Sequence, residues 1–231
     1  MRARVGWLLI VVLACFAVAG NAAAADVKAE LISPTPGTNL GASATFTWSP
    51  GSGSAEYSLA IGSSLGGSNV YNQSQGLNTS VTVATLPAGG GTLYVRLYTR
   101  FLTTGWQFID YTFTAMAGAK AELTTPTPGT NLGASATFTW SPGIGAAEYS
   151  LAIGSSVGGS NVYNQSQGLN TSVTVATLPA GGGTLYVRLY TRFLTAGWQF
   201  TDYTFTAMPG AKAELTTPAA GSTLASNATF T

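Results

Sequence analysis

The sequence contains no histidine, and its one cysteine, Cys15, lies close to the N-terminus. A serine or cysteine nucleophile of the common hydrolase classes needs a histidine to take its proton, which argues against those classes. Histidine and cysteine are also the usual ligands of zinc, copper and iron. We therefore expect no enzyme, no catalytic residues, no metal site and no cofactor.

Charged residues are scarce as well. They make up 7% of the chain, against 45% hydrophobic residues, and the sequence holds 29 glycines. The formal net charge is +1, which provides no basic face for nucleic acid. The polar surface must therefore come from Ser, Thr, Asn, Gln and the backbone. This composition is typical of an extracellular β protein with many turns.

Residues 1–25 have the three parts of a secretory signal peptide. Arg2 and Arg4 supply the positive start, an apolar stretch follows, and Ala23 to Ala25 form a small-residue cleavage site. The apolar stretch is about 15 residues long, which is short for a membrane span of roughly 20. We therefore expect a secreted protein, extracellular or periplasmic, with no membrane contact after cleavage.

Two alternatives to a cleaved leader remain open. The apolar stretch could stay as an uncleaved anchor, or Cys15 within "VLAC" could be lipidated, because these residues loosely resemble a lipobox. After cleavage before Asp26 the chain has no cysteine. Its stability must then come from a hydrophobic core rather than from disulfide bonds.

The chain contains a long internal repeat. The motif "KAEL" begins at Lys28, Lys120 and Lys212, which gives a period of 92 residues. Segments 29–120 and 121–212 differ at eight positions only, namely Ile32/Thr124, Ser33/Thr125, Ser52/Ile144, Ser54/Ala146, Leu65/Val157, Thr104/Ala196, Ile109/Thr201 and Ala117/Pro209. A unit of this length is too long for a solenoid repeat and about right for a complete β-sandwich.

The period divides the chain into domains. We predict a first repeat at 26–119, a second at 120–211, and at 212–231 the truncated start of a third. The last segment is too short to bury a core. We expect it to be disordered or to be borrowed as an edge strand by a neighbour, so that the chain represents a fragment of a longer array.

Each repeat shows the two-residue alternation of β-strands. In "SATFTWS", Ala44, Phe46 and Trp48 share one face, and threonine and serine occupy the other. Turn residues separate seven such segments, which in the first repeat are 29–34, 43–49, 56–62, 69–72, 79–86, 92–101 and 106–115. The pattern predicts an all-β chain of tandem seven-stranded antiparallel β-sandwich domains.

Three segments carry a family resemblance. "FTWSPG", "EYSLAIG" and "VTVATLPAGGGTLYVRLYT" resemble a fibronectin type III or related immunoglobulin-like tandem module of a secreted bacterial protein. The residues that match by type and order are Trp48, Tyr57, Leu86, Pro87 and Tyr94, with Trp140, Tyr149, Leu178, Pro179 and Tyr186 in the second repeat. The stretch from Leu86 to Tyr94 is about two residues longer than the family's tyrosine corner, so the corner hydrogen bond is not expected.

Aromatic residues provide the one candidate site. In "TLYVRLYTRF" the alternation places tyrosine and arginine outward, and the last strand could add further side chains to this face. The candidate ligand-binding residues are Tyr94, Arg96, Tyr98, Arg100, Trp106 and Asp110, with Tyr186, Arg188, Tyr190, Arg192, Trp198 and Asp202 in the second repeat. The face suits stacking on sugars. A cross-strand ladder that only protects the sheet is the favoured interpretation of the same residues, and Trp106 could instead fold inward.

Two patterns that suggest enzymes have simpler explanations. "GSSLG" at Gly62 to Gly66 fits the nucleophile-elbow pattern, but without a histidine a glycine-rich turn is the better interpretation. Glu30, Glu56 and Asp110 are the carboxylates that recur in each full repeat, and nothing indicates the cleft that a glycosidase pair would need.

The leading functional hypothesis is a non-catalytic secreted or cell-surface array. Its sandwich domains would act as a structural spacer or an adhesive module toward another surface protein, and the short junction at 116–120 would make a semi-rigid rod. The alternative is a carbohydrate-binding module, accessory to an enzyme or surface protein, with a polysaccharide as partner.

Overall fold

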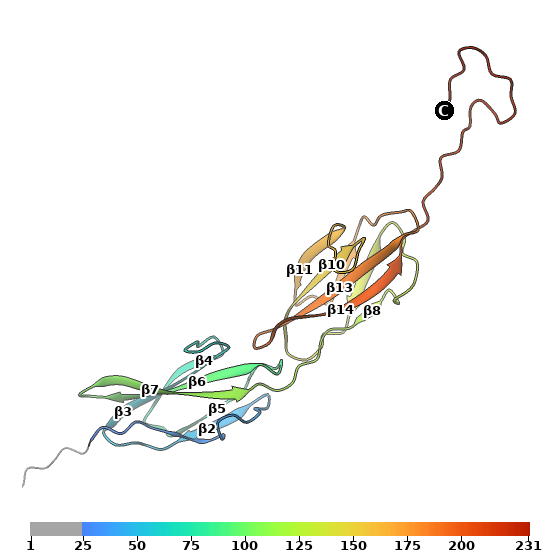
Figure 1. Ribbon diagram of the computed structural model, residues 1–231. Coiled ribbons are helices and arrows are strands. Elements are labelled where there is room, and N and C mark those ends of the chain that lie inside the picture. The colour runs from blue at the N-terminus through green and yellow to red at the C-terminus, as the bar shows by residue number, and fades with distance from the viewer. Residues whose placement is uncertain (1–24) are drawn as a thin grey trace, which may run out of the picture.

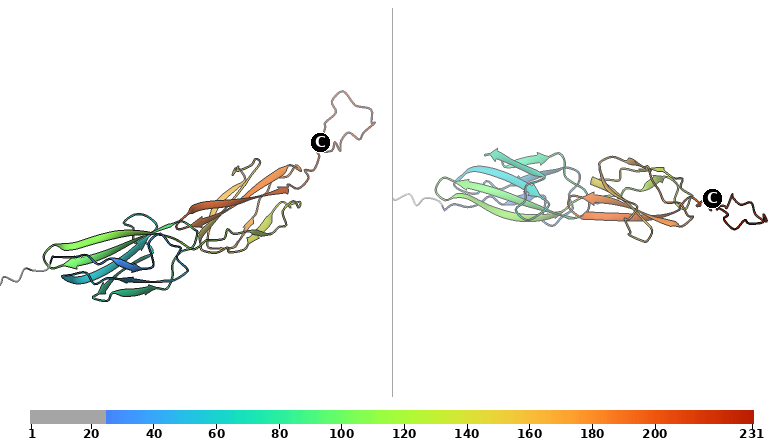
Figure 2. Two further views of the ribbon diagram at one scale, coloured as in Figure 1. Left: turned by 60° about the horizontal axis from the view of Figure 1, so that its bottom comes forward. Right: turned by 90° about the horizontal axis from the view of Figure 1, so that it is seen from above.

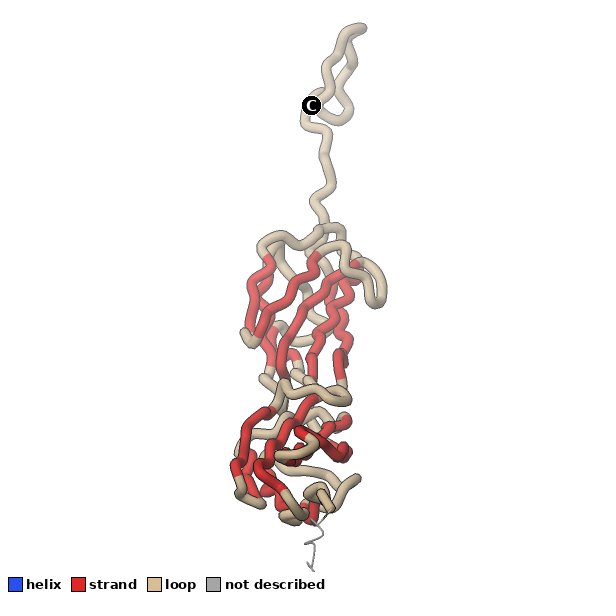
Figure 3. The backbone as a smooth tube through the Cα atoms, turned by 90° about the vertical axis from the view of Figure 1, so that its left-hand side faces the viewer, coloured by secondary structure: helices blue, strands red, loops and turns tan. Residues whose placement is uncertain are grey.

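The computed structural model describes residues 25–231. The predicted signal peptide, apart from its last residue, and Cys15 lie outside the described residues. Two β-sandwiches lie end to end and a looped C-terminal segment follows them (Figure 1). Every regular element in the described range is a strand, as Figure 3 shows. None of residues 25–231 forms an apolar helix of membrane-spanning length.

The first sandwich contains seven strands in two antiparallel sheets. One sheet has the order β1-β2-β5 and the other β4-β3-β6-β7. The strands are β1 (Leu31–Ser33), β2 (Ala44–Trp48), β3 (Ser54–Gly62), β4 (Tyr71–Gly76), β5 (Ser80–Val83), β6 (Thr92–Phe101) and β7 (Gly105–Thr114).

The second sandwich repeats this arrangement with sheets β8-β9-β12 and β11-β10-β13-β14. Its strands are β8 (Leu123–Thr125), β9 (Ala136–Trp140), β10 (Ala146–Gly154), β11 (Tyr163–Gly168), β12 (Ser172–Val175), β13 (Thr184–Phe193) and β14 (Gly197–Thr206). The predicted all-β sandwich fold is confirmed. In the constant immunoglobulin domain the fourth strand joins the sheet of the first two. Here β4 pairs with β3 instead, which widens the sheet that contains β6 and β7.

The fourth strand differs from the prediction. Residues 69–72 were the expected strand, but β4 begins at Tyr71 and continues to Gly76. Most of its residues are exposed on both faces, because it is the edge of its sheet and has no partner beyond it. A polar edge strand has no apolar alternation, so the periodicity that identified the other strands does not mark where it ends.

Each sandwich encloses its own core. In the first, Phe46 packs edge-on against Phe113, with ring centroids 5.8 Å apart, and Trp48 packs against Tyr57 at 6.1 Å. Leu93, Val95 and Leu97 of β6 are fully buried beneath them, and the equivalent side chains fill the second core. The expected apolar faces of β2 and β6 therefore meet between the two sheets.

Side-chain hydrogen bonds fix the N-terminal segment across the core. The backbone N–H of Ala29 donates to the buried hydroxyl of Thr99 at 3.0 Å, and that of Leu31 donates to the hydroxyl of Tyr111 at 2.9 Å. These bonds satisfy donors for which the short strand β1 offers no ladder partner. Tyr111 thus ties the first sheet to the second, a role that the sequence analysis did not assign to it.

Residues 212–231 contain no strand. The segment forms an open loop whose ends meet, where Thr216 donates its N–H to the carbonyl oxygen of Thr231 at 2.9 Å and Thr231 donates to Thr217 at 3.0 Å. The predicted start of a third repeat therefore does not form a third sandwich here.

Candidate binding surface

The candidate residues of β6 lie on the outer face of the four-stranded sheet. Along this strand, burial alternates strictly: the leucine and valine side chains point into the core, while Tyr94, Arg96, Tyr98 and Arg100 point outward. The alternation follows from the strand pleat, which sends successive side chains to opposite faces.

Strand β7 adds a second outward row beside the first. The register pairs Arg96 with Asp110, Tyr98 with Phe108, and Arg100 with Trp106. Trp106 is 47% exposed, so the alternative in which it folds into the core is wrong. Phe108 is 45% exposed in the same row and was absent from the candidate residues, although its position two residues from Trp106 on a strand implies the same face.

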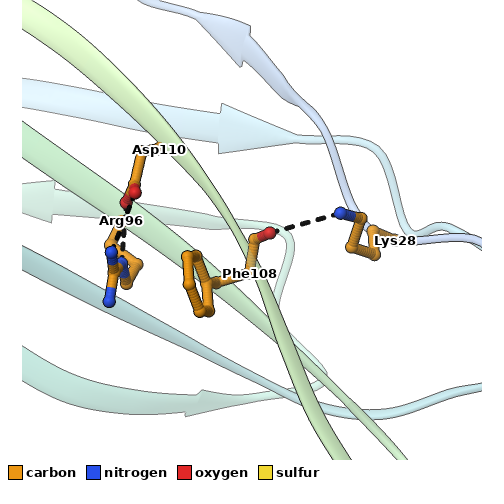
Figure 4. Close-up of polar contacts among 4 residues, drawn as sticks. All are labelled: Lys28, Arg96, Phe108 and Asp110. Atoms are coloured by element: carbon orange, nitrogen blue, oxygen red, sulfur yellow. Dashed lines mark hydrogen bonds and ion pairs between the residues drawn. The ribbon is translucent and has the colours of Figure 1, made fainter. Parts of the chain in front are cut away.

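An arginine fork occupies the centre of the face. Arg96 donates from Nε to Oδ1 of Asp110 at 2.7 Å and from Nη2 to Oδ2 at 2.8 Å. Its guanidinium also lies 3.7 Å from the ring centroid of Phe108 (Figure 4). The hydrogen bonds from Arg96 hold the pKa of Asp110 below its usual value. This part of the face has its hydrogen bonds satisfied internally, as the ladder interpretation requires.

The backbone beneath Phe108 makes a further contact. Its carbonyl oxygen accepts a hydrogen bond from Nζ of Lys28 at 3.3 Å (Figure 4). The equivalent bond from Lys120 to Phe200 is 2.8 Å long in the second sandwich. The lysines of the first two "KAEL" motifs thus join the start of each sandwich to its last strand.

Arg100 forms a second polar cluster near the edge. Its Nη1 lies 3.2 Å from Oε2 of Glu56, and the hydroxyl of Ser74 donates to Oε1 of Glu56 at 2.6 Å. The bond from Ser74, and after it the contact with Arg100, lowers the pKa of Glu56. Glu56 and Asp110 therefore each have an arginine partner, and neither is a free carboxylate poised for acid–base chemistry.

A hollow lies between the two polar clusters. Ser58 of β3, Asn72 of β4, Tyr98 and Trp106 line it, and its volume is about 310 Å³. The rings of Tyr98 and Trp106 meet edge to face, 6.1 Å apart. We call this feature the Tyr–Trp hollow. Ser58 and Asn72 carry no signal in the sequence, because only the pairing of β3 with β6 and of β4 with β3 brings them beside Tyr98.

The second sandwich contains the same hollow. Ser150, Asn164, Tyr190 and Trp198 line it, with a volume of about 290 Å³. Arg188 forks onto Asp202 at 2.7 and 2.8 Å, and Arg192 reaches Glu148 at 3.2 Å. The candidate residues of both repeats therefore occupy equivalent places, and none of the eight sequence differences falls on the hollow.

Tyr94 and Tyr186 lie away from the hollow. In the second sandwich, Tyr186 lines a separate depression of about 290 Å³ together with Arg188, Asp202 and the turn at Val157 and Gly158. The arginine fork separates this depression from the hollow. In the first repeat, Tyr98 and Trp106 therefore come together in the hollow, with the two arginines and the aspartate at its border. Tyr94 lies outside it, and the second repeat has the same arrangement.

The "GSSLG" segment is a turn. It starts at Gly62, the last residue of β3, and the N–H of Gly67 donates to the carbonyl oxygen of Ser64 at 2.9 Å. The side chain of Asn69 accepts from the N–H of Ser63 at 3.0 Å and closes the turn. The strand-to-helix geometry of a nucleophile elbow is thus not formed at this segment. Within residues 25–231, no group of three or more His, Cys, Asp or Glu side chains is placed to hold a metal ion.

The Tyr–Trp hollow combines ring surface with uncharged hydrogen-bonding groups. A hydroxyl and an amide face two rings, whereas the charged side chains nearby are engaged with one another. Such a site can bind a ligand that presents both apolar C–H faces and neutral hydroxyl groups.

The fold and this surface define a tandem of sandwich modules. No family model matches the sequence, and no curated protein matches it. Among solved structures, the chain is similar to a two-domain fibronectin type III segment of chicken tenascin, at 16% identity over 79% of this chain and 99% of that one, with a TM-score of 0.39.

Two further structures give weaker likenesses. The FN1–FN3 domains of chicken CNTN1 are 14% identical over 78% of this chain and 66% of theirs, with a TM-score of 0.28. CopC from Methylosinus trichosporium OB3b is 19% identical over 41% of this chain and 99% of its own, with a TM-score of 0.31. The sheets and their strand order themselves show that each repeat is a sandwich of the fibronectin type III-like or immunoglobulin-like kind.

Proposed function

We propose that the chain is a non-catalytic structural array of a secreted or cell-surface protein, in which sandwiches joined end to end act as a spacer that presents their outer faces to a partner. The observation that carries this proposal is the packed junction between the two sandwiches. The views in Figure 2 agree that they meet through their ends.

Three glycines allow the two ends to touch through their backbones. A Cβ atom on Gly118 would lie 2.6 Å from Cε1 of Phe193, and one on Gly91 would lie 2.0 Å from the carbonyl oxygen of Thr195. A Cβ atom on Gly145 would lie 2.4 Å from that of Ala88. No real Cβ atom approaches other atoms so closely, so this packing requires glycine at each of the three positions.

The contacts leave little freedom for a hinge. Ala88 is 4% exposed at the junction, and the hydroxyl of Thr195 in the second sandwich lies 3.5 Å from the carbonyl oxygen of Ala88 in the first. Ala119 of the linker exchanges backbone hydrogen bonds of 3.1 and 2.9 Å with Ile144, which fixes the linker to the second sandwich. Flexible linkers between domains are polar and make few contacts with either side. The packed junction therefore supports a stiff connection and a fixed spacing.

The sequence supports the remaining parts of the proposal. The leader and the low charge suit a secreted chain, and the complete absence of histidine argues against the common catalytic sets. The two arginine-paired carboxylates described above add no free acid or base.

The junction can be tested by measuring a distance across it. The chain has no cysteine after Asp26, so Ser80→Cys and Ser172→Cys introduce two unique sites for spin labels on exposed positions of β5 and β12. Pulsed electron resonance should give one narrow distance distribution. Gly118→Asp should broaden it, because a side chain there displaces Phe193.

Ala117→Asp is the matched control. It adds the same charge one residue away, at an exposed position, and should leave the distribution narrow. A broad distribution in the double-cysteine chain without the glycine substitution would contradict the stiff spacer.

A second candidate function is polysaccharide binding, and the duplicated Tyr–Trp hollow favours it. Pyranose rings stack on aromatic side chains, and their hydroxyl groups can bond the side chains of Ser58 and Asn72. Two equivalent hollows on one chain suit a polymer with repeating units.

Binding to immobilised polysaccharides tests this candidate. Where the chain binds a polysaccharide, Trp106→Ala combined with Trp198→Ala should abolish the binding. Ile32→Ala, a 65% exposed residue of the opposite sheet, serves as the control and should leave the binding unchanged. Undiminished binding by the double tryptophan variant would eliminate the hollows as the site.

A further inference from the structure

The C-terminal end of the second sandwich repeats a surface that is covered in the first. In the first sandwich, Ala88, Gly89 and Gly91 contact the second sandwich, and Met116 pairs with Ala88 beside them. Their counterparts are identical in type, namely Ala180, Gly181, Gly183 and Met208. Ala180 is exposed where Ala88 is buried, and Met208 is 38% exposed. We call this set the free end.

The contacts of the covered end show what the free end can hold. Cβ atoms on Gly89 would lie 2.7 Å from Cβ of Phe193 and 3.0 Å from the hydroxyl of Thr195, so both side chains rest on that glycine. The equivalent Cβ positions on Gly181 and Gly183 meet no atom within 4 Å. The free end therefore has the shape that receives the hairpin of a following sandwich, without an occupant among the described residues.

The N-terminal end of the first sandwich is built differently. There Asp26 accepts hydrogen bonds from the hydroxyls of Thr103 at 2.8 Å and Thr104 at 3.1 Å. With the period of 92, Asp26 stands at the position of Gly118. The carboxylate of Asp26 thus caps the hairpin formed by β6 and β7. In the second repeat the equivalent position is Gly118, which has no side chain and whose backbone packs against Phe193.

Three of the eight sequence differences fall at this same end. Each replaces a hydroxyl side chain of the first repeat by an apolar one in the second, namely Ser52/Ile144, Ser54/Ala146 and Thr104/Ala196. Leu102 is 84% exposed in the capped end, whereas its counterpart Leu194 is partly buried. The two repeats therefore carry two kinds of N-terminal end, one polar and capped, the other apolar and docked.

We propose that the free end is a docking surface for the N-terminal end of another sandwich of this repeat, one that has glycine at the Gly118 position. The chain itself carries this glycine as Gly210, followed by the same "AKAEL" as after Gly118. A sandwich that starts with Asp26 is not the occupant, because its carboxylate fills the place that Gly89 and Phe193 share at the junction.

This inference rests on the proposed spacer function and names the partner of its next junction. The test extends the full chain after Thr231 with residues 140–211, which completes a third copy in register. Spin labels at Ser172→Cys and at the equivalent serine of the added copy report on the new junction. Labels at Ser80→Cys and Ser172→Cys report on the existing one.

The expected result is a distance distribution at the new junction with the same mean and width as at the existing one. Gly210→Asp should broaden the new distribution alone, and Ala219→Asp, on the same segment, should not. A narrow existing junction with a broad new one would overturn the docking proposal and leave the spacer intact, whereas two broad distributions would overturn the spacer as well. Head-to-tail dimers of the unextended chain in sedimentation would also overturn the selectivity assigned to Asp26.

Discussion

The first sandwich has two tryptophan–tyrosine pairs, one in the core and one on the outer face of the four-stranded sheet, and we expect them to play different roles. Trp48 is 2% exposed and packs against Tyr57, whereas Trp106 is 47% exposed and packs against Tyr98. Both pairs have edge-to-face geometry with ring centroids 6.1 Å apart. Geometry within a pair therefore does not distinguish core from surface. The face of the sheet on which the pair lies makes this difference. We therefore expect the inner pair to contribute most to the free energy of unfolding and the outer pair to contribute most to contacts with a ligand.

The largest expected effect is on the inner pair. Trp48→Ala should lower the free energy of unfolding by about 3–5 kcal/mol, because it opens a cavity in a closed core. Trp48→Phe should cost much less, since Nε1 of Trp48 has no hydrogen-bond partner among residues 25–231 and the substitution leaves no lost bond. Denaturant unfolding measures both. Equal losses would show that packing of the ring is not what stabilises the core.

The next effect concerns the tie between the sheets. Tyr111→Phe removes the hydroxyl that accepts the N–H of Leu31 and leaves a partly buried donor without a partner. We expect a loss of about 1–3 kcal/mol. Thr47→Ala, on the outward side of β2, is the control and should change stability by less than about 0.5 kcal/mol. Hydrogen exchange at Leu31 should accelerate in the tyrosine variant only.

Substitutions in the outer pair should have a small effect on the free energy of unfolding. Trp106→Ala removes a half-exposed ring that contacts Tyr98, and should cost only about 1 kcal/mol of stability. A loss as large as that of Trp48→Ala would erase the distinction between the two regions. Thermal unfolding of the single variants, at equal protein concentration, makes the comparison.

The smallest effect is the pH dependence of the arginine fork. The pKa of Asp110 is lowered in the folded protein by Arg96. A lowered folded pKa means that the stabilisation is present above the unfolded value, about pH 4, and is lost as the pH falls through the folded pKa. Because the pair is partly exposed, we expect at most about 1 kcal/mol. Asp110→Asn should flatten this part of the profile of stability against pH, measured between pH 6 and pH 2.

The sequence predicted the fold well because its signal is local. Alternation along 43–49 and 92–101 separates inward from outward side chains without any knowledge of the partner strand. The extent of β4 and the places of Ser58 and Asn72 depend instead on pairing between distant strands, which alternation does not encode. Tyr111 was missed for the same reason, since its partner lies 80 residues away. That the outer face binds a ligand stays a prediction.

The role of the junction glycines could not be predicted from one repeat alone. In the sequence Gly118 is an ordinary linker glycine, and only the contact with the following sandwich shows why a side chain does not fit there. Its meaning comes from comparing it with Asp26, its counterpart one period earlier.

The proposed stiff connection has a consequence for any polymer that would reach both hollows. With a loose tether, the second hollow could search for its ligand over a wide volume, and chains of many lengths would be bridged. Under the proposed spacer function, the junction would hold the two hollows at one separation and one relative rotation, so a bridging polymer would have to match that repeat distance. The pair of sandwiches would then select polymers by their repeat distance, and every further sandwich joined in the same way would increase this selectivity.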